Sequence, residues 1–192
     1  MWSSLSIPGA PRILMVDATV NLQGWEHAFS DRLFASLQRT EMEMLEKGPT
    51  QIREAPELIS LMSASVFNCL ILIAHTGPEQ NSSDAKLSVF WKALRKPADL
   101  PLFLLAVCSY GSCDLQVSEE VLKSSPAVAP LAIVPISSVV PREAGLFYLK
   151  FFTELKLHST DSISSKMVWF SFTKARELLR RRRYSTKFDI RC

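Results

Sequence analysis

Short apolar runs alternate with segments of helical period along most of the chain. The apolar runs predict strands at residues 12–19, 40–45, 66–74, 100–107 and 131–136. Apolar residues that recur every three or four positions predict helices over residues 24–38, 57–64, 87–94, 114–123, 142–157 and 164–183. Strands that alternate with helices are typical of a parallel sheet flanked by helices. We therefore expect an α/β fold.

The patterns also suggest an order for the strands. Residues 66–74 and 100–107 are apolar on both faces, so we expect both strands in the centre of the sheet. Residues 40–45 fit either a strand near an edge or a continuation of the preceding helix. We expect a three-layer α/β/α sandwich whose mostly parallel sheet has the order 2-1-3-4-5. One domain would cover residues 12–183, between an N-terminal extension (1–11) and a basic C-terminal tail (184–192).

Composition narrows the class of protein. Of the 192 residues, 47% are apolar and 21% are charged, which excludes disorder and collagen-like structure. No apolar run is long enough for a membrane-spanning helix and no signal peptide is visible, so we expect a cytoplasmic or nuclear protein without a membrane partner. The spacing of Cys69, Cys108, Cys113 and Cys192 predicts neither a metal site nor a disulfide framework. Cys69 lies inside an apolar run and is expected in the core.

Basic residues gather near the end of the chain. Residues 174–192 carry eight basic and two acidic side chains, whereas the other 173 residues carry 14 basic and 17 acidic ones. The run Arg180–Arg183 has two interpretations: it interacts with the C-terminal dipole of the last helix, or it is a nuclear-import or nucleic-acid patch. We favour the first, because basic runs are weak motifs, and therefore do not expect a nucleic-acid partner.

Polar or reactive residues stand at the ends of three predicted strands. Asp17 closes the first strand, His75 the third and Cys108 the fourth. In an open parallel sheet, reactive loops lie beyond the carboxyl ends of the strands, where the strand order reverses. An imidazole near a cysteine takes its proton or stabilises its thiolate. The pattern predicts a reactive Cys108–His75 pair; the alternative is that both residues are structural, since free cysteine is often buried.

The residues around this pair resemble a known family. Residues 72–77 (LIAHTG) and 104–109 (LLAVCS) are similar to the His and Cys motifs of the caspase-like cysteine peptidases, most of all the CHAT branch. Residues 132–136 and 144–155 resemble the fifth strand and the following helix of that family. The resemblance implies peptide-bond hydrolysis through an acyl-enzyme on Cys108, with His75 as general base or imidazolium partner and no cofactor. The oxyanion hole would use the backbone N–H of Cys108 and one just after His75.

The chain departs from the family's pattern beside both residues. The family's glycine directly follows the histidine, whereas here Thr76 stands before Gly77, and a β-branched residue disfavours the backbone angles that glycine allows. The neighbours of Cys108 also differ from the usual motif. These departures support an alternative function, a catalytically inactive CHAT-like interaction module or a subunit of a larger assembly. In that case the chain binds a protein partner and does not cleave a protein or peptide substrate.

Asp17 also has two interpretations. In related peptidases a residue near the end of the first strand lines the specificity pocket, so the resemblance implies that Asp17 binds an arginine or lysine before the cut bond. The alternative is a solvated helix-capping or loop aspartate. We favour this alternative, because aspartate commonly caps helices.

Overall fold

A computed structural model describes residues 5–18, 25–64, 66–75, 87–94, 104–110, 119, 123, 129, 131–137 and 139–191 of the chain. The main sheet contains β2 (Arg12–Asp17), β3 (Glu43–Met44), β4 (Thr50–Gln51), β5 (Cys69–His75), β6 (Leu104–Tyr110), β7 (Leu131–Pro135) and β9 (Phe188–Arg191). Its order is β3-β2-β5-β6-β7-β9, and β4 also pairs with β2. Each neighbouring pair is parallel except β7 and β9, which are antiparallel. The predicted α/β fold with a mostly parallel sheet is confirmed.

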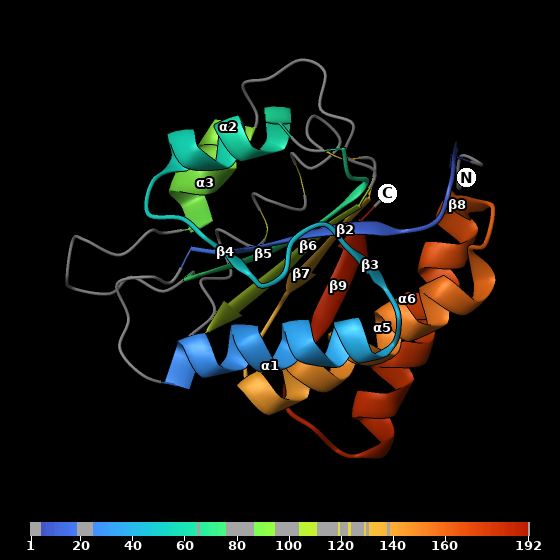
Figure 1. Cartoon of the computed structure of the whole chain (residues 1–192). Coiled ribbons are helices and arrows are strands. Elements are labelled where there is room, and N and C mark those ends of the chain that lie inside the picture. Colours follow the sequence, from blue (N-terminus) through green and yellow to red (C-terminus); the bar gives the residue numbers. More distant parts are fainter. Residues whose placement is uncertain are drawn as a thin grey trace.

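Helices lie on both faces of this sheet (Figure 1). One face carries α2 (Ala55–Ala64) and α3 (Leu87–Leu94), and the other carries α1 (Trp25–Arg39), α5 (Pro141–His158) and α6 (Ser165–Arg181). The buried side chains form two clusters, because successive strand residues point to opposite faces. Ile13, Cys69 and Leu104 belong to the cluster beside α1, α5 and α6, whereas Leu14 and Leu70 belong to the other.

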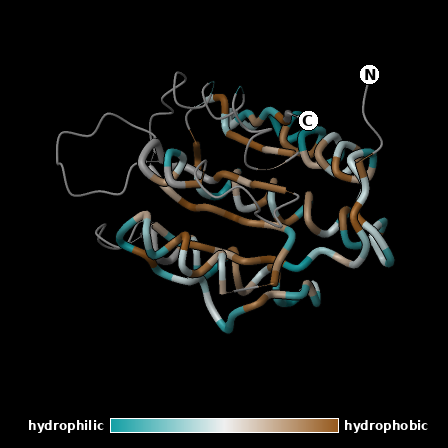
Figure 2. The backbone as a smooth tube through the Cα atoms, turned by 90° about the horizontal axis from the view of Figure 1, so that it is seen from above, coloured by the Kyte–Doolittle hydropathy of each residue, from teal (hydrophilic) through white to brown (hydrophobic). Residues whose placement is uncertain are grey.

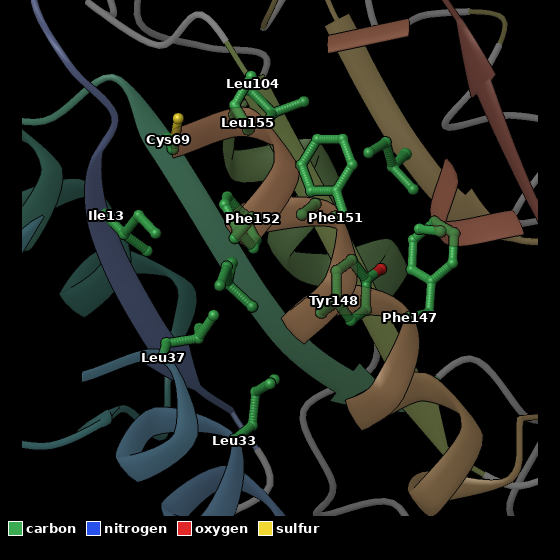
Figure 3. Packing of buried hydrophobic residues seen from close by; sticks show 14 of the residues in the cluster. Ile13, Leu33, Leu37, Cys69, Leu104, Phe147, Tyr148, Phe151, Phe152 and Leu155 are labelled. Carbon is green, nitrogen blue, oxygen red and sulfur yellow. The ribbon is translucent and has the colours of Figure 1, made fainter. Parts of the chain in front are cut away.

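Burial on both faces explains why the central strands are continuously apolar. Figure 2 shows these strands in the brown of hydrophobic residues, whereas the helices mix brown and teal. Figure 3 shows how α5 packs on the sheet through a row of fully buried side chains. The row consists of Phe147, Tyr148, Phe151, Phe152 and Leu155. Each such side chain contributes about 1.5–3 kcal/mol by its burial, so α5 is a main anchor of the fold.

Local signals in the sequence explain where the last two helices begin. Pro141 occupies the first turn of α5, where its missing N–H costs nothing. Ser164 caps α6, since its hydroxyl accepts a 3.3 Å hydrogen bond from the backbone N–H of Met167. Both helices therefore start within a residue of the predicted positions. Within the described part of the chain, no helix is long and apolar enough to cross a membrane.

Short segments near both termini take part in sheets, where the sequence predicted an extension and a tail. Near the N-terminus, β1 (Ser6–Pro8) pairs with β8 (Ser162–Ser164) in an antiparallel two-stranded sheet. Near the C-terminus, β9 pairs with β7 and buries Phe188 and Ile190 on either side of Asp189. These strands were missed because each is only three or four residues long, and because basic residues dominate the composition around β9.

Several predicted boundaries also change. Residues 40–45 contain the short edge strand β3 and not more helix. Val66, the predicted start of the third strand, is exposed, and β5 begins at Cys69. Of the helix predicted over 114–123, residues 119 and 123 are helical and their side chains form an ion pair of 3.2 Å, while the rest lies outside the described residues. Residues 100–103 of the fourth predicted strand also lie outside them.

Candidate active site

Three neighbouring strands bring the candidate residues to one region of the sheet. Asp17 on β2 is the register partner of Ile73 on β5, and Ile73 is the partner of Cys108 on β6. Asp17, Ile73 and Cys108 therefore form one row across the sheet. His75 is the last residue of β5 and pairs with Tyr110. As predicted, Asp17 and His75 close their strands.

The backbone of His75 lies close to that of Cys108. One strand spacing of about 4.8 Å and two residues of about 3.3 Å each separate the two positions, which gives a Cα–Cα distance of roughly 8 Å. This separation lets two side chains on neighbouring strands approach each other. Thr76 and Gly77, the candidate turn after His75, lie outside the described residues.

Cys108 does not close its strand, contrary to the prediction. It lies inside β6, which continues through Ser109 to Tyr110. The prediction ended the strand at the last aliphatic residue, Val107. The ladder extends further because Ala74 and His75 of β5 pair with Ser109 and Tyr110. The residues before Cys108 and the residues after it are therefore all paired with β5, which holds Cys108 in place.

Asp17 is buried and not solvated. Its side chain has 0% exposure, and its Oδ2 accepts a 2.6 Å hydrogen bond from the hydroxyl of Ser30, which lies inside α1. A buried carboxylate needs such donors, because burial without them is costly. The prediction of a solvated aspartate is therefore wrong, and in this structure the carboxylate offers no surface to a substrate arginine. Asp17 instead joins the end of β2 to α1.

A second buried contact supports the segment that contains Cys108. The hydroxyl of Tyr148 on α5 donates a hydrogen bond to the carbonyl of Val107, directly before Cys108. The pairing of β6 with β7 covers Leu104 to Ala106, so Tyr148 holds β6 at the next residue. The sequence patterns did not predict this role of Tyr148. The available signal was a tyrosine among the phenylalanines of a buried helix face, because a buried hydroxyl needs a partner.

Of the four cysteines, Cys69 is the one whose side chain the structure describes. It is unsuited to catalysis. It is completely buried at the start of β5, and burial raises the pKa of its thiol. Such a thiol stays protonated and has no access to substrate. Among the described residues, no cluster of three His, Cys, Asp or Glu side chains could hold a metal ion.

No family model matches this chain. A comparison with curated proteins also finds no match. The caspase-like resemblance therefore rests on the residues of the two motifs and on the order of elements around them.

The basic run lies at the C-terminal end of α6. The helix ends at Arg181, Arg182 caps it, and Arg183 has a left-handed backbone with φ of 55°. Arg181 forms an ion pair of 2.7 Å with Glu177, and the hydrogen bond and charge of Arg181 lower the pKa of that carboxyl. This position fits the favourable interaction with the helix dipole that we expected from the sequence.

Proposed function

We propose that this chain is a cysteine peptidase of caspase-like fold, in the CHAT branch, and that Cys108 and His75 form its catalytic dyad. The observation that carries the proposal is the register of β5 and β6, which leaves the two residues on adjacent parallel strands about 8 Å apart. The sheet order and the helices on both faces support the finer assignment, a three-layer sandwich with the strand order of the family.

The proposed reaction proceeds through an acyl-enzyme. The His75 imidazole takes the proton of the Cys108 thiol, and the thiolate attacks the carbonyl carbon of the scissile peptide bond. When the C–N bond breaks, the imidazolium gives that proton to the leaving amine. A water molecule, deprotonated by His75, then attacks the thioester, which releases the carboxylic acid and restores the thiol. The backbone N–H of Cys108 and one after His75 would stabilise the oxyanion.

Two buried contacts supply the rigidity that such a dyad needs. Tyr148 ties the residue before Cys108 to α5, and the hydrogen bond from Ser30 to Asp17 ties the end of β2 to α1. Because reacting groups must be held within a fraction of an ångström, these supports belong to the proposal as positioning residues. We leave Asp17 out of the proposed substrate contacts, since it is buried.

Alkylation of the full chain by an iodoacetamide probe tests the dyad. Cys108 should react about tenfold faster than Cys69, Cys113 and Cys192 at pH 7, because an imidazole partner raises its thiolate fraction. His75→Ala should remove this advantage, and His158→Ala should keep it, since His158 lies on the exposed side of α5. Equal rates for Cys108 in the wild type and in His75→Ala would overturn the dyad.

A catalytically inactive interaction module is the second candidate. Thr76, which separates His75 from Gly77, is one reason to consider it. The other reason is structural: an open groove with an apolar floor lies between α1 and α5. If Cys108 has ordinary reactivity and no peptide library is cleaved, this second function is preferred.

A further inference from the structure

The groove between α1 and α5 has a volume of about 620 Å³. Apolar side chains form its floor: Phe29 and Leu33 come from α1, and Leu146 and Leu149 come from α5. Gly145 brings the two helices close together, because a Cβ at this position would lie 3.3 Å from Cε2 of Phe29. The close contact between α1 and α5 therefore shapes the groove, and none of its described lining residues belongs to β5 or β6.

Arginine side chains surround this apolar floor. Arg32 from α1, Arg142 from the first turn of α5 and Arg182 from the end of α6 all line the groove and are exposed. Within the described part of the chain, none of these arginines is in an ion pair. The acidic neighbour of Arg142, Glu143, accepts a 2.7 Å hydrogen bond from the backbone N–H of Thr186. The rim thus presents positive charge to any occupant.

We propose that this groove binds a short, acidic, amphipathic helix of a partner protein. On α1 the lining extends from Phe29 to Ser36, which corresponds to a length of roughly 10 Å, or two helical turns. A partner helix with apolar residues at positions i, i+4 and i+7 would bury them on the floor. Acidic residues beside these positions would meet the arginines, whereas basic residues would be repelled.

A protein helix suits the groove better than an anionic membrane. Phe29 and Leu33 lie at the bottom of the groove and are each less than 10% exposed. A bilayer binds apolar groups that project from the surface of a protein. A side chain of a partner helix can enter the groove, whereas a flat lipid surface cannot reach its floor. Binding of a partner helix would also give Arg182 a role beyond its interaction with the dipole of α6.

Fluorescence anisotropy with two synthetic peptides tests this proposal. Both are 18-residue fluorescein-labelled helices with leucines at i, i+4 and i+7; one carries glutamates beside the leucines and the other carries lysines. The glutamate peptide should bind the full chain with a Kd of about 10–100 µM, as expected for a small interface. The lysine peptide should bind at least about tenfold more weakly. Binding should be the same with Cys108→Ala, so failure of the dyad leaves this test intact.

Variants of the exposed arginines locate the binding site. Arg32→Gln, Arg142→Gln and Arg182→Gln should each weaken binding of the glutamate peptide about two- to fivefold. Arg180→Gln is the matched control, because Arg180 belongs to the same basic run but does not line the groove. It should leave the Kd unchanged.

Three results would overturn the proposal. The first is no saturable binding of the glutamate peptide up to 1 mM, and the second is an equal Kd for both peptides. The third is that the chain binds phosphatidylserine vesicles, and that the three arginine variants abolish this binding while they leave peptide binding unchanged. That last result would assign the rim to an anionic lipid surface.

Discussion

The hydroxyl of Ser30 donates a 2.6 Å hydrogen bond to Oδ2 of Asp17, and both side chains are almost completely buried. This contact joins the middle of α1 to the carboxyl end of β2, in the same row of the sheet as Cys108. The residue before Ser30 is Phe29, which lines the groove. The proposed docking surface and the support of the candidate active site therefore use adjacent residues of α1.

Removing the hydroxyl of Ser30 should destabilise the fold. Ser30→Ala leaves the buried Asp17 carboxylate without this donor, so the free energy of unfolding should fall by about 1–3 kcal/mol. Urea unfolding measures the change. Ser36→Ala on the same helix is the control, because it gains the same helix propensity of roughly 0.5 kcal/mol without touching Asp17. Equal midpoints for the two variants would show that the contact adds no stability.

The hydroxyl of Tyr148 offers a separate test of positioning. Tyr148→Phe removes the hydrogen bond to the carbonyl of Val107 and keeps the ring in the core, so we expect a loss of about 1–2 kcal/mol. Under the proposed function, alkylation of Cys108 should also slow, because the segment of β6 before it is less restrained. Tyr184→Phe, at a half-buried position, should change neither quantity. If Tyr148→Phe alters stability but not alkylation, Tyr148 is structural only.

Apolar patterning was sufficient to predict the central part of the fold. Strands such as β5 are buried on both faces, and the helices that cover the sheet repeat apolar residues with a clear period. Hydrophobicity alone therefore marks both the strands and the helices. The short strands β1, β8 and β9 escaped prediction. Their pairing depends on contacts between residues far apart in the sequence, such as Ile7 with Ile163, which no local pattern encodes.

The candidate site was predictable in position but not in environment. Asp17, His75 and Cys108 could be assigned to neighbouring strands near one edge of the sheet, because parallel strands share a carboxyl edge. The end of β6 was misplaced, since Ser109 and Tyr110 extend the strand through pairing with β5 and not through their own hydrophobicity. The burial of Asp17 and the role of Tyr148 were also missed. Both depend on helices that fold back onto the sheet from elsewhere in the chain.

The buried thiol of Cys69 should make stability depend on pH in the alkaline range. Burial raises the pKa of this thiol far above its ordinary value of 9.0, so the folded chain keeps a proton that the unfolded chain loses. The resulting stabilisation is complete below about pH 9 and is lost as the pH rises above it. Between pH 8 and pH 10, the free energy of unfolding should fall by about 1.4 kcal/mol more in the wild type than in Cys69→Ala.

Urea unfolding at pH 8, 9 and 10 provides this comparison. Only the difference between the two slopes matters, since Cys69→Ala also loses packing, and since other groups titrate equally in both proteins. Parallel curves for the wild type and Cys69→Ala would mean that the thiol ionises as easily in the folded chain as in the unfolded one. Cys69 would then be more accessible than the structure indicates.

The edge strand β9 should be essential for stability, although the sequence suggested a basic tail. Phe188 is 2% exposed, and its ring stacks on that of Phe147 with a centroid distance of 4.1 Å. Phe188→Ala should therefore lower the free energy of unfolding by about 3–5 kcal/mol. Phe170→Ala is the matched control: Phe170 is 41% exposed, so its loss should cost about 1 kcal/mol or less.

Deletion of residues 184–192 should destabilise the chain at least as much as Phe188→Ala, because it removes the whole strand from the side of β7. An unchanged urea midpoint after this deletion would mean that β9 is dispensable and that residues 184–192 behave as the tail that the sequence suggested.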